Sequence, residues 1–481
     1  MMMSKAVSHL CFMLIAVILA RSLPPVEFGT FNQVWLVNRT MIYLFALGLP
    51  VSVYYFLPRL PSAEIKGFIL QTMLGLALLA IPFAIGMYAL AGTLALYFNN
   101  PALAHYLRLF AIFPLVTMPT ISTDAILISL GRTTNAAIFE VATKVVMILS
   151  VAAAATVGGG LGMVFKALVI YGVVQSLLGL WLVWRPLKKV EFHFSLSDWK
   201  AQLAFAAPFG FSTLAGILNY QVDKVVIALF YAPAVFALYA AGAFEIPLAG
   251  VTSVPVLSVT MPEFAKKFKS RDIDGFLALL HESMLNLGVL VFAVAAFLMV
   301  FAGPVITTLF GTQYADSALP FRVYLLFLPL RITLFDQVLA SLGDTRYVLK
   351  SQLAVLLVNI VLACILVRYF GWLGPAVSTL LAGYLGATML VFAIRKRLNL
   401  TLSQLLPWRA LGRLALVAIL AAAGAVPIGL LAIGPIWKLA AGFLVFAMIY
   451  VAGNIKTQTI TMGHLQTLRS WVSIPSRSVT G

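Results

Sequence analysis

The sequence predicts an all-α polytopic membrane protein with about 14 transmembrane helices, arranged as two six-helix lobes related by a parallel repeat, plus two C-terminal helices. Three observations lead to this prediction. Hydrophobic residues make up 62% of the 481 positions and charged residues only 10%, whereas soluble domains carry roughly 25% charged residues. Apolar windows long enough to cross a bilayer recur along the chain. A ten-residue motif also occurs twice, at 124–133 and 336–345.

Each apolar window marks one predicted helix. The predicted spans are 6–20, 31–57, 67–89, 105–130, 134–156, 161–184, 201–230, 233–258, 277–303, 319–342, 347–368, 373–394, 410–432 and 435–453. The first window is favoured as a helix over a signal peptide because no hydrophilic mature domain follows it. The windows 201–230 and 233–258 are long enough that tilt, or a kink at Pro208 or Pro255, is expected.

The duplicated motif reads DAILISLGRT in the first copy and DQVLASLGDT in the second, 212 residues later. Each copy follows an apolar run with an internal proline, Pro114 or Pro329. Gly131 and Gly343 are expected to stop their helices, because glycine accepts the left-handed conformation at a helix end. The copies therefore occupy the same joint of two similar halves.

The repeat sets the predicted domain boundaries, since the two motifs mark the fourth and the tenth helix. The predicted parts are an N-terminal lobe at 1–190, a C-terminal lobe at 200–398, two further helices at 399–455 and a cytoplasmic tail at 456–481. Six helices is an even number, so both lobes cross the membrane in the same sense and the repeat is parallel.

The net charge of +17 is explained by topology. Most Lys and Arg fall in alternate short loops, which places both termini in the cytoplasm. Nucleic-acid binding is disfavoured because no basic domain large enough for a groove exists. Cys11 and Cys364 lie in apolar runs, and the five histidines form no ligand pair, so no disulfide framework, metal or cofactor is predicted.

Charged residues inside the spans are the main functional signal, because each costs at least about 2.5–3.5 kcal/mol at the bilayer centre. The basic ones are Arg39, Lys144, Lys166, Lys224 and Arg331, and the acidic ones are Asp124, Glu140, Asp223, Glu245 and Asp336. Such residues are expected to face protein or a water-filled cavity.

Among the basic residues, Arg39 and Arg331 are the stronger cavity candidates, because both lie well inside a span. Lys144 stands four residues after Glu140, so the two could simply neutralise each other. Lys166 lies near a helix start and is expected to snorkel to the surface.

The acidic residues have structural alternatives too. Asp223 lies beside Lys224 near a helix end, where either could snorkel. Asp124 and Asp336 each stand about two turns before a helix stop, and could serve only as hydrogen-bond acceptors for a neighbouring helix. Glu245 precedes a proline that frees a backbone carbonyl, which suggests a cation or proton site.

Several short motifs occur in a characteristic order. They are EFGTF at 27–31, ALGLP at 46–50, the Gly131–Arg132 exit, Pro208 with NYQVDK at 219–224, and Tyr239–Ala240 with Ile246–Pro247. With this spacing, residues 6–453 resemble the polysaccharide transporter family of the multidrug/oligosaccharidyl-lipid/polysaccharide superfamily, the O-antigen-type lipid-linked oligosaccharide flippases.

The resemblance implies a non-enzymatic transporter of the bacterial cytoplasmic (inner) membrane. It would move an oligosaccharide carried on polyprenyl pyrophosphate across the bilayer by alternating access, for surface polysaccharide biosynthesis, and its partners could include polysaccharide polymerase machinery. Basic cavity residues would hold the anionic substrate, with Arg39 the best match and Lys144, Lys224 and Arg331 as further candidates. Asp124, Asp223, Glu245 and Asp336 are candidates for coupling to H⁺ or Na⁺.

Three alternatives stay open. A drug/cation antiporter of the same superfamily would want acidic cavity residues, which the spans also contain. A peptidoglycan-precursor flippase would need the same physics as the oligosaccharide flippase. A membrane glycosyltransferase or polymerase is disfavoured because the outward loops are short, and no Gly-rich ATP-binding loop supplies energy.

Overall fold

The computed structural model describes residues 2–185, 196–244, 260–261 and 263–457. In these residues the secondary structure is entirely helical, with no strand. Eleven helices in the described part of the chain are long and apolar enough to span a membrane, and the number rises to 12 if one bent pair counts as a single span. The chain is therefore a multi-pass membrane protein, as predicted, although the structure does not confirm a count of 14.

The chain divides into two compact units. Unit 1 comprises Met1–Phe244 and Leu356–Thr379, and unit 2 comprises Glu245–Val355 and Leu380–Gly481. The boundaries cut through two long helices, α18 (Thr345–Tyr369) and α19 (Gly374–Leu398). The six-helix lobes expected from the repeat stay a prediction.

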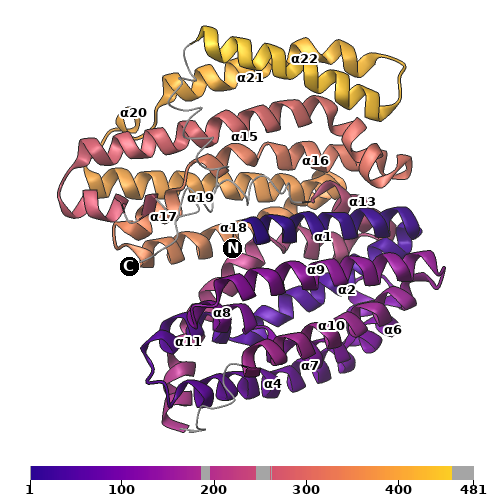
Figure 1. The fold of residues 1–481 in the computed structure, drawn as a ribbon. Coiled ribbons are helices and arrows are strands. Elements are labelled where there is room, and N and C mark those ends of the chain that lie inside the picture. Colours follow the sequence, from indigo (N-terminus) through magenta and orange to yellow (C-terminus); the bar gives the residue numbers. More distant parts are fainter. Residues whose placement is uncertain (1, 186–195, 245–259, 262, 458–481) are drawn as a thin grey trace. The chain divides into compact units, whose positions relative to one another are not determined.

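Unit 1 is built from helices that pack along their length. They are α1 (Met2–Ser22), α2 (Pro25–Ala46), α3 (Leu49–Phe56), η1 (Leu57–Arg59), α4 (Ile65–Ala89), α5 (Ala91–Tyr97), α6 (Pro101–Phe110), α7 (Ile112–Thr117), η2 (Met118–Thr120), α8 (Thr123–Ser129), α9 (Thr133–Thr156), α10 (Gly160–Trp184), α11 (Leu196–Asn219), α12 (Val222–Phe230) and α13 (Pro233–Gly242). The helix α1 packs against α9, α9 against α10, and α2 against α13 (Figure 1).

A bend of 42° separates α2 from α3. Leu47 (φ 47°) and Gly48 (φ 73°) both adopt the left-handed conformation there, so the α2 helix ends before α3 begins. The backbone of α11 approaches this point closely, because a Cβ on Gly48 would lie 2.4 Å from the Ala206 carbonyl oxygen. The predicted span 31–57 is thus a bent helix pair that is fixed against α11.

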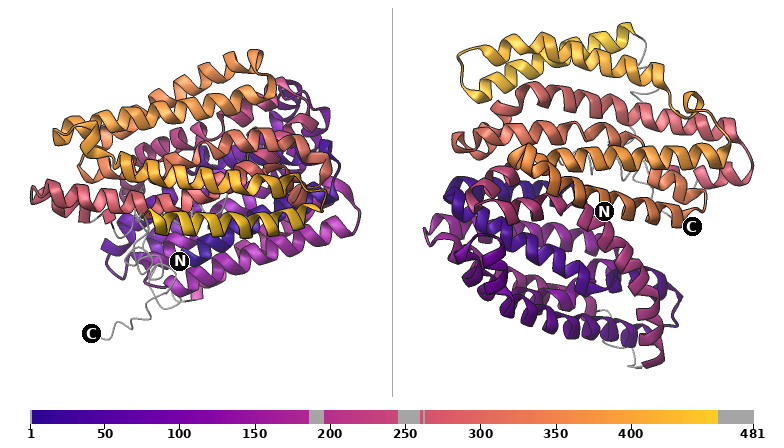
Figure 2. Two further views of the ribbon diagram at one scale, coloured as in Figure 1. Left: turned by 90° about the horizontal axis from the view of Figure 1, so that it is seen from above. Right: turned by 180° about the vertical axis from the view of Figure 1, so that it is seen from behind.

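Unit 2 contains a second set of helices. After the helical residues at 263–269 come α15 (Ile273–Phe310), η4 (Thr312–Ser317), α16 (Ala318–Leu325), η5 (Leu328–Ile332), α17 (Phe335–Ser341), α20 (Leu402–Leu405), α21 (Trp408–Leu430) and α22 (Pro435–Lys456), with parts of α18 and α19. The last two helices, α21 and α22, lie side by side and pack against α15 in every view (Figure 2).

The start of α15 carries a charged cap. Asp272 accepts a hydrogen bond from the Gly275 backbone N–H at 2.9 Å and another from Lys267 Nζ at 3.1 Å. The Gly275 bond first, and then the Lys267 bond, hold the pKa of Asp272 below its usual range. The N-cap of α4, Glu64, makes no such side-chain hydrogen bond.

The duplicated motif has the same local geometry in both copies. In the first, Gly131 (φ 73°) follows α8 and the Arg132 N–H donates to the Leu127 carbonyl at 2.8 Å. In the second, Gly343 (φ 84°) follows α17, and Asp344 N–H donates to the carbonyl of Leu339 at 3.2 Å. Both glycines are helix stops, which confirms the prediction.

Breaks elsewhere follow the repeat as well. The helices α4 and α5 separate at Leu90 (φ −83°, ψ 0°), and α15 has a non-helical residue at Phe301 (φ −93°, ψ 18°). The two positions differ by 211 residues, one less than the offset of the motif. The long predicted helix 277–303 therefore repeats the α4–α5 pair with its break retained.

Besides 31–57 and 277–303, three further predicted spans are interrupted among the described residues where the sequence suggested continuous helices. Residues 105–130 break at η2 and 319–342 break at η5, each a 3-10 turn with proline near its start. Residues 201–230 break at Tyr220 and Gln221, whereas Pro208 lies inside α11 without ending it. Pro255, the other predicted kink, lies outside the described residues.

Candidate functional site

Arg39 occupies the exposed face of α2, near the middle of the bent pair that runs from Pro25 to Arg59. The opposite face of α2 is buried and includes Val34, Val37 and Asn38. Among the described residues, the Arg39 side chain has no hydrogen bond and no ion pair. An unpaired cation half-way along a span is costly in lipid, so this face requires water or an anionic ligand.

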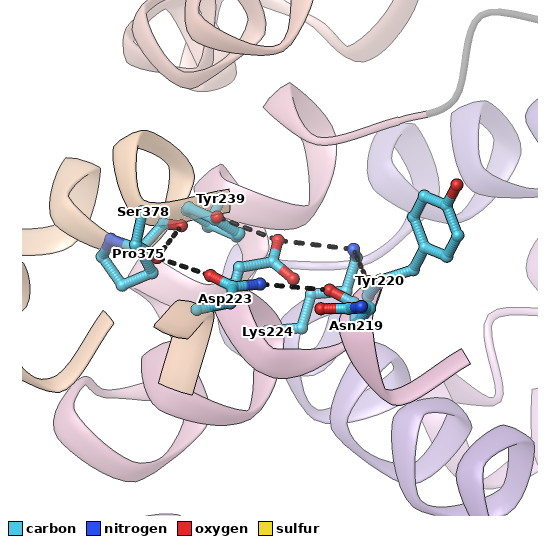
Figure 3. A network of polar contacts seen from close by, with 8 residues as sticks. Asn219, Tyr220, Asp223, Lys224, Tyr239, Pro375 and Ser378 are labelled. Atoms are coloured by element: carbon cyan, nitrogen blue, oxygen red, sulfur yellow. Dashed lines mark hydrogen bonds and ion pairs between the residues drawn. The ribbon is translucent and has the colours of Figure 1, made fainter. Parts of the chain in front are cut away.

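Asp223 and Lys224 lie just after the break between α11 and α12. The buried Asp223 carboxylate accepts a hydrogen bond from the Tyr239 hydroxyl at 2.9 Å, and Lys224 Nζ lies 3.4 Å from the same oxygen. Lys224 also donates to the Tyr220 carbonyl at the break, at 3.0 Å. Figure 3 shows these groups converging at one point. The groups that Lys224 contacts thus belong to the same helix break, at Tyr220 and Asp223.

The same network continues to the hairpin of α18 and α19. Asn359 donates to the Asn219 carbonyl at 3.3 Å, and the Ser378 hydroxyl donates to Asn359 at 3.0 Å (Figure 3). All three side chains are buried. Asn359 and Ser378 were not singled out from the sequence, although a polar residue inside an apolar span was the available signal.

Lys144, Glu140 and Asp124 form a second charged group in unit 1. The three residues come from α9 and α8 and lie within electrostatic range of one another. The Ser8 hydroxyl of α1 donates to Glu140 at 3.0 Å, and the Lys144 ammonium lies 5.0 Å from the Phe12 ring centre. The predicted pair of Lys144 and Glu140 is therefore part of a larger group, which includes side chains of α1 and the nearby charge of Asp124.

Unit 2 carries the two remaining described candidates. Arg331 lies in η5 with its guanidinium 5.6 Å from the Phe327 ring centre. Asp336 is in the first turn of α17 and accepts a hydrogen bond from Gln352 at 3.5 Å. Glu245 lies outside the described residues.

A buried amide network holds the bent pair in place and was also missed from the sequence. Gln202 of α11 donates to the hydroxyls of Ser52 and Thr72 at 2.9 Å each, and Gln71 donates to the Gln202 carbonyl oxygen at 3.3 Å. These residues come from α3, α4 and α11. Polar groups paired in this way fix the position of α3 in a low-dielectric core.

The described residues contain no group of three or more His, Cys, Asp or Glu side chains that could hold a metal ion. The described candidate residues lie in three separate sets within unit 1 and one in unit 2.

Comparison with known proteins identifies the family. The sequence model of the polysaccharide biosynthesis protein family matches residues 1–268. The chain belongs to this family. The matched residues 1–268 include Arg39 and both charged groups of unit 1. No sequence among the curated proteins matches the chain.

Solved structures show the fold of the chain. The lipid II flippase MurJ, in an inward closed conformation, matches with a TM-score of 0.76 and 14% identity over 95% of this chain and 98% of that one. An inward-facing multidrug resistance MATE transporter of the MOP superfamily matches with a TM-score of 0.66 and 18% identity, covering 82% and 94%. A MOP superfamily transporter from Pyrococcus furiosus reaches 0.54 and 17%, covering 83% and 95%. The fold is that of MOP-superfamily transporters.

Proposed function

We propose that the protein exports an oligosaccharide carried on polyprenyl pyrophosphate across the bacterial cytoplasmic membrane, by alternating access, for surface polysaccharide biosynthesis. The observation that carries this proposal is the exposed, unpaired Arg39 near the middle of the α2–α3 span. A pyrophosphate group crossing a low-dielectric region needs a cation that forms bidentate, charge-assisted hydrogen bonds, and arginine provides them. Membership of the polysaccharide biosynthesis family supports the class of substrate.

The other candidate cations are weaker sites for the anionic substrate. Lys224 already contacts Asp223 and a backbone carbonyl. Lys144 lies among acidic groups. Arg331 of unit 2, beside the Phe327 ring, is the remaining candidate. Arg39 is thus the principal proposed contact of the pyrophosphate, and Arg331 the second.

In the proposed topology both termini are cytoplasmic and two lobes alternate, with the halves assigned at 1–190 and 200–398. Coupling to H⁺ or Na⁺ would use Asp124, Asp223, Asp336 or Glu245. The exported oligosaccharide would pass to polysaccharide polymerase machinery. No enzymatic step is part of this proposal.

A peptidoglycan-precursor flippase is the second candidate function. It is favoured by the similarity to MurJ, which extends over 95% of the chain. Deletion of the gene separates the two candidates, because the lipid-linked sugar that accumulates on the cytoplasmic face identifies the substrate. A drug/cation antiporter would instead give greater drug sensitivity and no accumulation, which would refute the flippase proposal.

Arg39→Ala tests the proposed site. We expect export to be abolished at unchanged protein level, because the pyrophosphate loses its bidentate partner. Lys166→Ala is the matched control, since Lys166 is an exposed cation of α10 that also lacks a side-chain partner among the described residues. Normal export by Arg39→Ala would remove Arg39 from the substrate path.

A further inference from the structure

Arg59 ends the same bent pair that carries Arg39, and its side chain is held in one position. It belongs to η1, directly after α3. The guanidinium donates a hydrogen bond to the Tyr55 carbonyl, and its carbon lies 3.9 Å from the centre of the Tyr55 ring. Arginine carries five N–H donors, so most of them stay available on this exposed side chain.

The Tyr55 ring that contacts this arginine is itself packed against other aromatic side chains. The Tyr55 ring stacks on Phe205 of α11 at 4.4 Å, and Phe205 meets Phe56 edge-on at 5.4 Å. Two groups this close to Tyr55 cannot share one face, so the ring lies between Phe205 and Arg59. The guanidinium therefore rests on a fixed aromatic surface with its outer side open.

Aromatic residues at the ends of membrane helices often serve only as interfacial anchors, and basic residues there often serve only as topology signals. Arg132, at the exit of α8, fits that description, because its side chain is exposed and has no contact among the described residues. Arg59 differs, since it makes a hydrogen bond and a ring contact at once. Ordering a long side chain costs conformational entropy, and an ordered guanidinium is suited to bidentate binding of a phosphoryl group.

The surroundings of Arg59 are positively charged. The elements α3 and η1 pack against α8, which places Arg59 and the Arg132 exit at the same end of unit 1. Lys66 lies in the first turn of α4, and Glu64 precedes it. Three cations and one carboxylate at this helix end attract anionic groups.

We propose that the Arg59 guanidinium, held on Tyr55 and Phe205, is an entry site that binds the pyrophosphate of the lipid-linked substrate before it reaches Arg39. This inference rests on the proposed function. The two arginines are 20 residues apart, roughly 30 Å along the helices at 1.5 Å per residue. One pyrophosphate group cannot contact both, so they act in sequence.

Binding of polyprenyl pyrophosphate to the purified full-length protein in neutral phosphatidylcholine nanodiscs tests the entry site. We expect Arg59→Ala to weaken binding about tenfold, because a charge-assisted hydrogen-bond pair is lost. Arg59→Lys is expected to fall between wild type and Arg59→Ala, and Tyr55→Leu likewise, since it removes the ring but keeps the carbonyl. Arg132→Ala is the matched control and should stay within about twofold of wild type.

A transport assay separates entry from passage. Arg59→Ala should raise the substrate concentration needed for half-maximal export and leave the maximal rate nearly unchanged, whereas Arg39→Ala abolishes export. If the wild type binds polyprenyl pyrophosphate and Arg59→Ala binds it equally well, the entry site is refuted and the proposed function stands. If the wild type does not bind polyprenyl pyrophosphate at all, both are refuted.

Membrane phosphate is the other source of the same chemistry. In nanodiscs that contain phosphatidylglycerol, a substrate site should keep its affinity for polyprenyl pyrophosphate within a few-fold. Complete displacement by phosphatidylglycerol would assign Arg59 to lipid headgroups and overturn the proposal.

Discussion

The two copies of the repeated motif agree at the helix exit and differ at the break that precedes the helix. Both exits have a left-handed glycine, Gly131 or Gly343, and both close with a hydrogen bond between residues five apart. Sequence identity and geometry coincide there. The exit is a requirement of the fold, because each half needs the same turn into its next long helix.

The breaks are chemically unlike. In unit 1 the Thr120 hydroxyl pairs with Ser176 at 3.0 Å, and Ser176 donates to the Val116 carbonyl at 2.7 Å. All the polar groups of this contact are thereby satisfied within buried structure. In unit 2 the break carries Arg331 against Phe327, followed by Leu334 with φ 50°. In unit 1, hydroxyl groups provide hydrogen bonds at the helix break, whereas unit 2 has a charged side chain at the corresponding point.

Among the variants that test the contrast between the two breaks, Arg331→Ala should give the largest effect on function. If the unit 2 break serves transport, export falls at least about tenfold, equivalent to roughly 1.4 kcal/mol, while the thermal midpoint of the purified protein changes little. The assay is export of the lipid-linked sugar at matched protein level. Lys350→Ala, an exposed cation of α18, is the control and should export normally.

Thr120→Val is the counterpart in unit 1 and should lower stability without lowering export. It removes the hydrogen bond to Ser176, which keeps its bond to the Val116 carbonyl, so the free energy of unfolding falls by about 0.5–1.5 kcal/mol and export per folded molecule is retained. Equal losses of export from Thr120→Val and Arg331→Ala would contradict the contrast between the two breaks.

Gly131→Ala and Gly343→Ala test the shared exit. Each substitution is expected to cost about 1–2 kcal/mol of stability, because a side chain disfavours the left-handed conformation. Nothing lies within 4 Å of an added Cβ at either site, so the two costs should match. Gly216→Ala, inside α11 with equally open space, should stabilise instead. Unequal costs at the two exits would show that the copies are not equivalent.

The smallest expected effect is on the starts of α15 and α4, another place where the halves differ. The pKa of Asp272 is lowered in the folded state, so its cap stabilises the protein above the ordinary pKa of about 3.9 and this contribution disappears as pH falls through the lower folded pKa. Thermal midpoints of wild type and Asp272→Asn should differ near neutral pH and converge in acid. Glu64→Gln, at the uncapped start of α4, should show no such gap at any pH.

Features set by local residue type were predictable from the sequence. The apolar spans follow from composition, and the exits follow from glycine at Gly131 and Gly343, because both depend on neighbours along the chain. The breaks were harder. The chain breaks at Tyr220, where no residue type forces it, whereas Pro208 does not end its helix.

The candidate site was predictable only in part. Arg39 was found from its charge inside an apolar span, and its exposure agrees with a cavity role without testing it. The bond from Tyr239 to Asp223, and those that link the Asn219 carbonyl, Asn359 and Ser378, could not be predicted, because they form only when separate helices pack together. Arg59 looked like an ordinary topology signal, since its support by Phe205 arises only when α11 packs on α3.

The Leu47–Gly48 turn fixes the angle between the two helices of the bent pair. A Cβ on Gly210 would lie 2.5 Å from the Leu47 carbonyl carbon, so the backbones of α11 and the turn touch with no side chain between them. The angle between α2, which carries Arg39, and α3, which leads to Arg59, can therefore change only if α11 moves as well. A hinge elsewhere in unit 1 would therefore move Arg39 and Arg59 together as one rigid body, with α11 as the axis of the movement.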